Sequence, residues 1–246
     1  MKNFVGATLM TAGLLLTVVG CSDSKGTNNT KQVSEEAAAI EQEETANIED
    51  QYGPAENFLT PDEEKEGFEY VEGLGGVKPY GFGYNDQVGI DGTDAPLKPI
   101  VIGPAKFTIK NVRVVDIIPS DDSADMLEAE TGGRVRSIVL DVESENTSDA
   151  DISFYPDQMT LTTDSGEQIE ADIFLSDDVG GDFLGKVKKE GSIRFLTKNP
   201  EQDIKNITLV IDPPSSPESY EDLGEQVRLD FEILETEDAL KRDGKK

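Results

Sequence analysis

The sequence contains no histidine and no tryptophan, and its single cysteine is Cys21. Without histidine the chain cannot build Ser-His-Asp or Cys-His catalytic sites, or zinc and copper sites with imidazole ligands. A single cysteine also excludes a disulfide within the chain, so folding must rest on a hydrophobic core. These absences leave open only catalysis by carboxylates, lysine or tyrosine.

Positive charge is also scarce in this chain. Its 246 residues include 22 Lys and Arg against 51 Asp and Glu, which gives a net charge of −29. Nucleic acid is therefore not expected as a partner, because binding to it depends on cations that neutralise phosphate. The acidic residues are spread along the sequence, which is typical of a hydrated surface suited to an alkaline or saline exterior. Cation binding is the alternative interpretation.

Long apolar runs are missing except near the start of the sequence. Residues 5–19 are uncharged and mostly apolar, but this run is shorter than the roughly 20 residues that a membrane-spanning helix needs. Lys2 precedes the run, and residues 18–20 lead into Cys21. The arrangement predicts a lipoprotein signal peptide over 1–20, cleaved before Cys21.

The segment that ends at Cys21 resembles the lipobox of bacterial lipoproteins. The resemblance implies that Cys21 receives a diacylglyceryl group and anchors the protein in the cell membrane, on its extracytoplasmic side. Two fatty-acyl chains such as palmitate make a stable anchor, because each buried methylene adds about 0.8 kcal/mol, whereas one chain binds only reversibly. We expect the membrane as a partner through this anchor, and an envelope protein or glycan as a further partner.

Residues 21–66 are expected to form a disordered acidic stalk. The stretch is polar and has no apolar stripe to bury. As a coil, about 45 residues span roughly 35–40 Å, enough to lift a domain away from the membrane. Near its end, Thr60, Pro61 and Glu63 form a helix-start signal, and Gly67 is a natural stop. This pattern predicts a short helix over 61–66.

Residues 67–99 interleave aromatic residues with glycines. We expect this segment to be irregular and to pack on the sandwich that follows, because aromatic rings chiefly supply buried area. A ligand-binding lip is the alternative. Residues 91–96 are rich in turn formers and lead into the compact domain.

Between residues 100 and 235, apolar residues recur at every second position. The clearest runs are 106–118, with one slip in the alternation that indicates a bulge, and 135–144. Shorter runs follow at 152–154, 159–163, 169–173, 193–195, 207–211 and 229–233. Short strands with one polar and one apolar face predict an all-β fold, an antiparallel β-sandwich. The remaining residues, 236–246, are expected to form a charged tail.

Three turn patterns occur in order within this region. They are Glu145-Asn146-Thr147-Ser148-Asp149, Asp164-Ser165-Gly166-Glu167 and Lys189-Glu190-Gly191. Their order is similar to that of the immunoglobulin-like lipoprotein domain of unknown function, which is grouped with the immunoprotective extracellular antigens. The resemblance implies an immunoglobulin-like β-sandwich on the cell surface, and it carries no activity or catalytic residues.

Two acidic clusters are candidate calcium sites, since calcium prefers six to eight oxygen ligands. The favoured cluster is Asp177, Asp178 and Asp182, because the glycines at 180 and 181 would let carbonyls turn inward. The other cluster lies in the acidic connection 119–134. Neither has the alternating spacing of an EF-hand loop, and hydrated loops are the alternative for both. No other cofactor is expected.

The sequence therefore predicts a lipid-anchored, extracytoplasmic module with a non-catalytic binding or accessory role at the cell envelope. One alternative is a calcium-dependent surface enzyme or carbohydrate-active domain that uses carboxylates, although no tryptophan is present to stack on a sugar ring. Another alternative is a structural spacer in the envelope.

Overall fold

The computed structural model describes residues 58–244 of the chain, whose regular secondary structure is mostly antiparallel strand. The strands are β1 (Glu69–Val71), β2 (Gly75–Tyr84), β3 (Ile100–Ile102), β4 (Ala105–Pro119), β5 (Val135–Asn146), β6 (Ile152–Phe154), β7 (Thr160–Thr163), β8 (Gln168–Glu170), β9 (Gly181–Phe183), β10 (Lys188–Leu196), β11 (Asn206–Ile211) and β12 (Val227–Glu235). The helices are α2 (Pro61–Glu66), α3 (Asp121–Ala124), α4 (Thr236–Arg242) and the 3₁₀ turn η1 (Pro156–Gln158).

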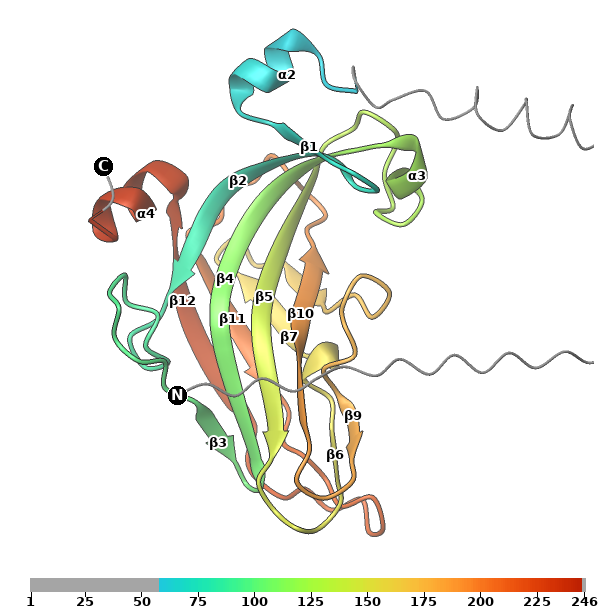
Figure 1. Ribbon diagram of the computed structural model, residues 1–246, viewed down its shortest axis with the longest axis vertical. Helices are drawn as coiled ribbons and strands as arrows, with labels where there is room; N and C mark the ends of the chain where they lie inside the picture. Colours follow the sequence, from blue (N-terminus) through green and yellow to red (C-terminus); the bar gives the residue numbers. More distant parts are fainter. Residues whose placement is uncertain (1–57, 245–246) are drawn as a thin grey trace, which may run out of the picture. The chain divides into compact units, whose positions relative to one another are not determined.

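Ten of the strands form one sheet. Its main path runs β10-β5-β4-β2-β12-β11-β7-β8, while β1 pairs with β2 and β3 pairs with β4. β6 and β9 form a separate two-stranded sheet. The large sheet is strongly curled, so that β4, β5 and β10 lie in front of β7 and β11 (Figure 1).

The alternation of apolar and polar residues explains which face of each strand is buried. In β5, Leu140, Val142 and Ser144 are buried, whereas Asp141 and Glu143 between them are partly exposed on the outer face. The slip predicted in 106–118 is a bulge in β4, where the register with β5 shifts between Ile109 and Asn111. The expectation of an antiparallel all-β fold is therefore confirmed.

A main hydrophobic core fills the inside of the curl. It joins buried side chains of β4, β5 and β10 to those of β7, β11 and β12. Phe107 and Phe154 meet edge to face, with ring centroids 6.1 Å apart. Each fully buried aromatic or aliphatic side chain contributes about 1.5–3 kcal/mol, so this core is the main source of stability.

The two facing layers of the core come from one curled sheet. The segment after β8 approaches the edge of β10, and the Asp172 N–H donates to the Arg194 carbonyl at 2.8 Å. The Asp177 N–H likewise donates to the Ser192 carbonyl at 2.8 Å. Face-to-face packing thus arises by bending the sheet back on itself, and the immunoglobulin-like strand arrangement stays a prediction.

The helix predicted over 61–66 is present as α2. The Thr60 hydroxyl accepts a hydrogen bond from the Glu63 N–H at 3.3 Å, and the Glu63 carboxylate accepts one from the Thr60 N–H at 2.8 Å. The bond from the Thr60 N–H, followed by a bond from the Thr60 hydroxyl to the same carboxylate, lowers the pKa of Glu63 below its ordinary value. Gly67 ends the helix with φ of 95°, a conformation that favours glycine.

Residues 67–99 differ from the expectation of an irregular cover. Their first half contains β2, which lies inside the sheet between β4 and β12. Glycines allow this position, because a Cβ at Gly81 would lie 2.6 Å from the Leu234 carbonyl oxygen. The compact unit therefore begins well before residue 100.

The expected charged tail also differs from the structure. Residues 236–242 form α4, and Ala239 of this helix is buried. The Thr236 hydroxyl donates to the Pro79 carbonyl at 3.1 Å, which ties the helix to β2. The signal peptide, Cys21 and the expected stalk up to residue 57 lie outside the described residues.

Candidate functional site

The sheet opens along one side of β4. The ladder from β2 to β4 ends at the Phe82–Arg113 pair, and the ladder from β3 to β4 begins at Phe107. Residues 108–112 of β4 therefore pair with β5 only. Within 58–244, no backbone hydrogen bond from a loop fills this gap.

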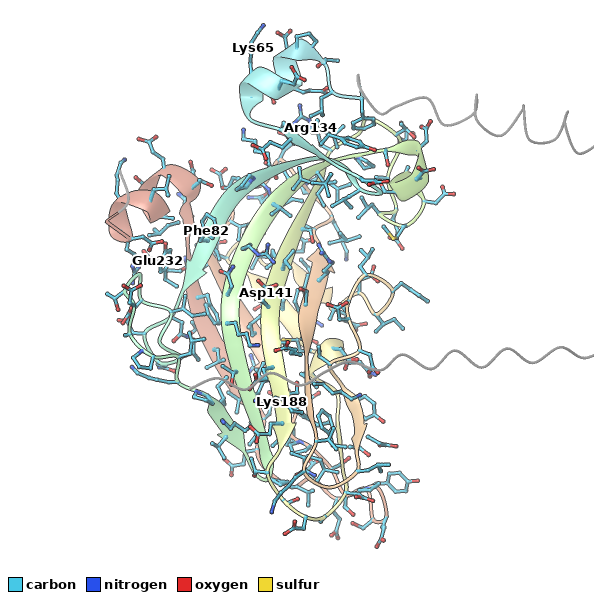
Figure 2. The ribbon with its side chains drawn as sticks, in the orientation of Figure 1. Lys65, Phe82, Arg134, Asp141, Lys188 and Glu232 are labelled. Atoms are coloured by element: carbon cyan, nitrogen blue, oxygen red, sulfur yellow. The ribbon has the colours of Figure 1, made fainter. Side chains whose placement is uncertain are left out.

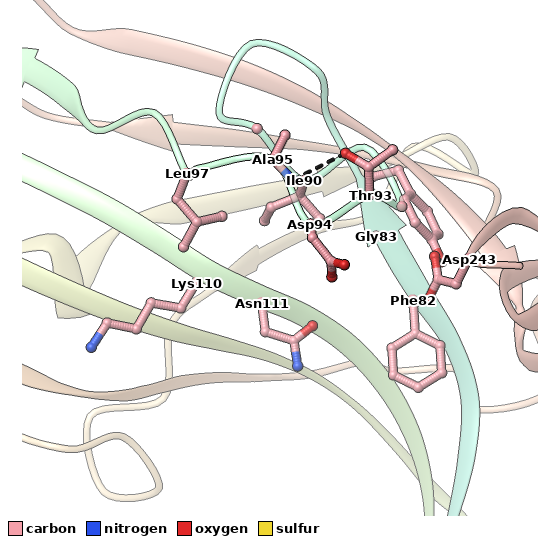
Figure 3. Close-up of a pocket in the computed structure, with 13 residues that line it drawn as sticks. Phe82, Gly83, Ile90, Thr93, Asp94, Ala95, Leu97, Lys110, Asn111 and Asp243 are labelled. Atoms are coloured by element: carbon pink, nitrogen blue, oxygen red, sulfur yellow. Dashed lines mark hydrogen bonds between the residues drawn. The ribbon is translucent and has the colours of Figure 1, made fainter. Parts of the chain in front are cut away.

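A pocket of about 240 Å³ lies at this opening. Phe82 lines it from β2, Asn111 from β4, and Ile90, Asp94 and Leu97 from the connection between β2 and β3. Figure 3 shows the Asp94 carboxylate pointing from this connection into the pocket. The pocket thus combines apolar surface, a carboxylate and an amide beside unpaired strand backbone.

Hydrogen bonds hold the 85–99 connection in place. The Asn85 side chain donates to the Asp230 carbonyl at 2.8 Å and accepts from the Gln87 N–H at 2.7 Å. The Lys98 N–H donates to the Val88 carbonyl at 2.9 Å. This wall of the pocket is therefore built before any ligand arrives.

Tyr84 and the end of α4 form the opposite wall. The Tyr84 hydroxyl donates to the Asp243 carboxylate at 3.0 Å, and the Arg242 guanidinium lies 4.2 Å from the centre of the Tyr84 ring. Burial, followed by the Asp243 hydrogen bond, raises the pKa of Tyr84 to about 12. Tyr84 therefore stays a hydrogen-bond donor to Asp243 at neutral pH.

The bulge in β4 places two neighbouring polar side chains, Lys110 and Asn111, between the buried Ile109 and Val112. The Lys110 ammonium contacts Glu190 at 2.7 Å and Glu143 at 3.5 Å, and in Figure 3 it points away from the pocket centre. The Asn111 amide lines the pocket and makes no hydrogen bond to any residue of the described range. Bulges often re-aim side chains at functional sites, and here the bulge presents a free amide.

The structure does not gather the predicted calcium ligands. Among the described residues, no group of three acidic side chains is arranged to hold a metal ion. Asp177 accepts from the Ser192 N–H at 2.7 Å, and Asp182 accepts from the Ser153 hydroxyl at 2.6 Å. Asp178 pairs with Lys189 at 3.1 Å.

Lys189 lies among the oxygen atoms of this loop. Its ammonium contacts the Asp178 carboxylate, the Gly180 carbonyl and the Phe183 ring, whose centroid is 5.2 Å away. A protein cation therefore takes the carbonyl and the carboxylate that calcium would need. Residues 181–183, where glycines were expected to turn carbonyls inward, form the edge strand β9.

The second acidic cluster surrounds α3 at the start of the 119–134 connection. Asp121 and Asp122 occupy the first turn of this four-residue helix and are exposed. They favour the positive end of the helix dipole, which accounts for acidic residues at this place.

Sequence reasoning missed Phe82, Asp94 and Asn111 as one site. Two signals pointed in their direction: the slip in the alternation of 106–118, and the suggestion that the aromatic–glycine segment is a binding lip. What joins them is the departure of β2 from β4, which is a tertiary feature.

Comparison with known proteins finds a related sequence. Over 134 residues the chain is 31% identical to the SPbeta prophage-derived uncharacterized lipoprotein YonS of Bacillus subtilis strain 168. The relative is an uncharacterized lipoprotein. The match covers 53% of this chain and 59% of YonS, so the chain spans less than two thirds of its relative.

No known protein-family profile matches the chain. Among solved structures, a functionally unknown protein from Listeria monocytogenes EGD-e aligns with a TM-score of 0.46 and 14% identity, over 63% of this chain and 86% of that one. A putative lipoprotein of Bacillus subtilis, ycdA, aligns with a TM-score of 0.38 and 15% identity, over 56% of this chain and 39% of that one.

The part of the chain that the structure describes contains no helix long and apolar enough to span a bilayer.

Proposed function

We propose that this protein is a lipid-anchored, extracytoplasmic binding module, and that it holds a short extended peptide segment in the pocket at the sheet opening. The observation that carries the proposal is the stretch 108–112 of β4, whose backbone has no strand partner on the pocket side. An extended peptide placed there would continue the sheet between β2 and β3 through main-chain hydrogen bonds.

The side chains around the opening suit such a ligand. Phe82, Ile90 and Leu97 offer apolar surface to one side chain of the peptide. Asn111 and Asp94 offer an amide and a carboxylate for polar contacts. Small-molecule sites commonly combine apolar lining with a few placed polar groups in this way.

A glycan is the second candidate ligand. The observation that favours it is the Phe82 ring in the same pocket as the Asn111 amide and the Asp94 carboxylate. An aromatic face with hydrogen-bonding groups suits the apolar and polar faces of a sugar ring.

The state of the ionisable side chains near the pocket supports a non-catalytic role. The chain has no histidine to act as a general base. The Lys110 ammonium forms ion pairs with two carboxylates, and the Asp243 carboxylate accepts a hydrogen bond from the Tyr84 hydroxyl. Asp94 is left as a carboxylate suited to binding.

The anchor is supported by the lipobox resemblance of the segment ending at Cys21 and by the similarity to the lipoprotein YonS. Fatty-acyl chains on Cys21 would keep this acidic protein at a membrane whose anionic head groups repel it.

A fluorescence titration tests the binding proposal. The chain has no tryptophan, so Phe82→Trp places a single reporter in the pocket of the full chain in detergent. We expect a saturable emission change with acetyl-trialanine amide. The same peptide with methylated backbone nitrogens should bind at least about tenfold more weakly, because each lost hydrogen bond costs roughly 1 kcal/mol.

Phe174→Trp is the matched control, because Phe174 is exposed and lies outside the pocket lining. Its emission should not change with the peptide. A saturable response to an N-acetylglucosamine dimer in place of the peptide would select the glycan candidate. If neither probe changes the emission of the Phe82→Trp variant, the proposed binding site is wrong.

A further inference from the structure

A second pocket brings three cationic side chains together with three carboxylates in this strongly acidic protein. It measures about 300 Å³ and lies where the end of α2 meets the sheet. Three cationic side chains line it, those of Lys78, Arg134 and Arg136. The whole chain has only 22 Lys and Arg against 51 acidic residues, so three cationic side chains around one pocket are unusual for its composition.

Arg136 is a fixed part of the pocket wall. Its guanidinium forms a two-pronged pair with Asp116 at 2.7 and 3.1 Å and donates to the Gln202 carbonyl at 2.7 Å. It also stacks 3.7 Å from the centre of the Tyr80 ring, and only 7% of its side chain is exposed. Asp116 balances its charge.

Lys78 and Arg134 are much less neutralised. Both lie over the Phe68 ring, at 5.7 and 4.4 Å from its centroid. The Lys78 ammonium has no carboxylate within ion-pair distance among residues 58–244. Lys78 thus lacks a counter-ion in the described range and Arg134 has only an exposed one, so an added anion at this pocket is favoured.

The Glu66 carboxylate of α2 already supplies part of this negative charge. Glu66 lies 3.2 Å from Arg134, and the two side chains are 52% and 36% exposed. An ion pair this exposed contributes little to stability, so a competing anion can displace it at little cost. Figure 2 shows Arg134 beneath α2.

We propose that this pocket binds a small organic oxyanion, a phosphate or a carboxylate, between Lys78 and Arg134. The ligand would take the place of the Glu66 carboxylate on the Arg134 guanidinium, which binds oxyanions through paired N–H donors. Lys78 supplies the second charge. Glu201, the third carboxylate of the lining, limits how much negative charge the pocket accepts.

A structural alternative makes different predictions. If Lys78 and Arg134 serve only to pack against Phe68, removing Glu66 should create no anion affinity. If Glu66 occupies a real anion site, Glu66→Gln should raise the affinity because it removes the internal competitor. The proposal concerns a different pocket from the sheet opening and stands independently of it.

The test is a nuclear magnetic resonance titration of the full chain in detergent, with inorganic phosphate and with succinate at constant ionic strength. We expect saturable shifts of the Phe68, Lys78 and Arg134 amides. Glu66→Gln should tighten binding at least about threefold, and Lys78→Gln and Arg134→Gln should each weaken it at least about tenfold, as expected for a charge-assisted hydrogen bond.

Lys65→Gln is the matched control, because Lys65 lies on the same helix, is exposed and pairs with Asp62 outside the pocket. It should leave the affinity unchanged, and Lys78→Arg should retain binding if the charge itself matters. Saturation by phosphate alone or by succinate alone would identify the anion class. Absence of saturable shifts with both, or equal affinity in Lys78→Gln and the natural chain, would overturn the proposal.

Discussion

Lys189 determines what the 177–182 loop can hold. Its ammonium contacts Asp178 and the Gly180 carbonyl, the types of ligand that calcium would use. The residue lies on β10, seven positions beyond the acidic cluster. Sequence spacing within the cluster gave no indication of it, because the contact depends on how β9 and β10 pack.

Tyr220 has a strained backbone conformation, and its side chain is not buried. Its φ is 59° and its side chain is 83% exposed. We expect Tyr220→Gly to raise the free energy of unfolding by about 0.5–1 kcal/mol, because glycine adopts this conformation without strain. Urea denaturation of the full chain measures the change.

Tyr155→Gly is the control for that substitution. Tyr155 is 47% exposed and has φ of −121°, which any residue adopts. Here glycine relieves no strain and adds freedom to the unfolded chain, so the free energy of unfolding should fall. A loss of stability in both variants would show that Tyr220 is not strained.

The surroundings of Asp157 disfavour the charged form of its carboxyl group. Its Oδ1 atom is buried without a hydrogen-bond partner in the described range. Burial, and then the like charge of Asp178, raise the pKa of Asp157 above its ordinary value of 3.8. As the pH rises past 3.8, the unfolded chain loses this proton before the folded chain does, so ionisation lowers stability.

We therefore expect Asp157→Asn to have a higher melting temperature than the natural chain at pH 7. The difference should shrink as the pH falls and should vanish below 3.8, where both states hold the proton. Thermal melts between about pH 3 and pH 8 measure it. Asp151→Asn removes the same charge at an exposed position, and a pH-dependent gain of equal size there would contradict the prediction.

At the scale of elements, β2 shows how glycine can determine where a strand fits. The strand starts at Gly75, opposite Pro119 of β4. Gly75 has φ of +114°, and a Cβ there would lie 2.1 Å from the Ile118 carbonyl oxygen. The close approach of the two backbones therefore requires the absence of a side chain.

Gly75→Ala should consequently destabilise the protein by at least about 3 kcal/mol, since backbone strain adds to a clash that only a strand movement can relieve. Gly73→Ala is the matched variant, because Gly73 has φ of +74° but open space around its Cβ position. It should cost about 1 kcal/mol. Similar urea midpoints for the two variants would contradict the account of β2.

The strands that could be predicted are those whose pattern results from one buried face. β4, β5, β11 and β12 fall where the alternation predicted them, and the slip at 109–111 marks the bulge. β2 was not predicted, because its three aromatic residues alternate with glycines and not with polar residues, and Pro79 interrupts the run. α4 was missed because a single buried residue, Ala239, docks it.

The candidate site was less predictable than the fold. Its residues come from three separate segments, and they converge only because β2 leaves β4 before β3 joins it. The bulge that presents Asn111 was visible in the sequence, but its direction was not. The basic pocket was hidden in the same way, because Lys78 and Arg134 lie far apart in the sequence and meet only where β2 runs beside β4 and the 119–134 connection ends.

At the scale of the whole molecule, net charge and anchorage act in opposite directions. A charge of −29 opposes approach to anionic membranes and polymers, although at physiological ionic strength the repulsion fades beyond about 8 Å. An acyl anchor on Cys21 would hold the protein at the membrane in spite of that charge.

Cys21→Ser should remove fatty-acid labelling and shift the protein from the membrane fraction to the soluble fraction of cells. Ser22→Ala, which changes the adjacent residue and keeps the cysteine, should label and fractionate normally. Labelling that persists in Cys21→Ser would place the lipid elsewhere and contradict the predicted anchor.

The most direct test of the binding account is hydrogen–deuterium exchange of the full chain with and without acetyl-trialanine amide. The account predicts that residues 108–112 of β4, which have a strand partner on one side only, include amides that exchange faster than those of 138–142 in the free chain. Saturating peptide should slow them at least about tenfold. Equal protection of both stretches in the free chain, with no change on adding peptide, would contradict the account.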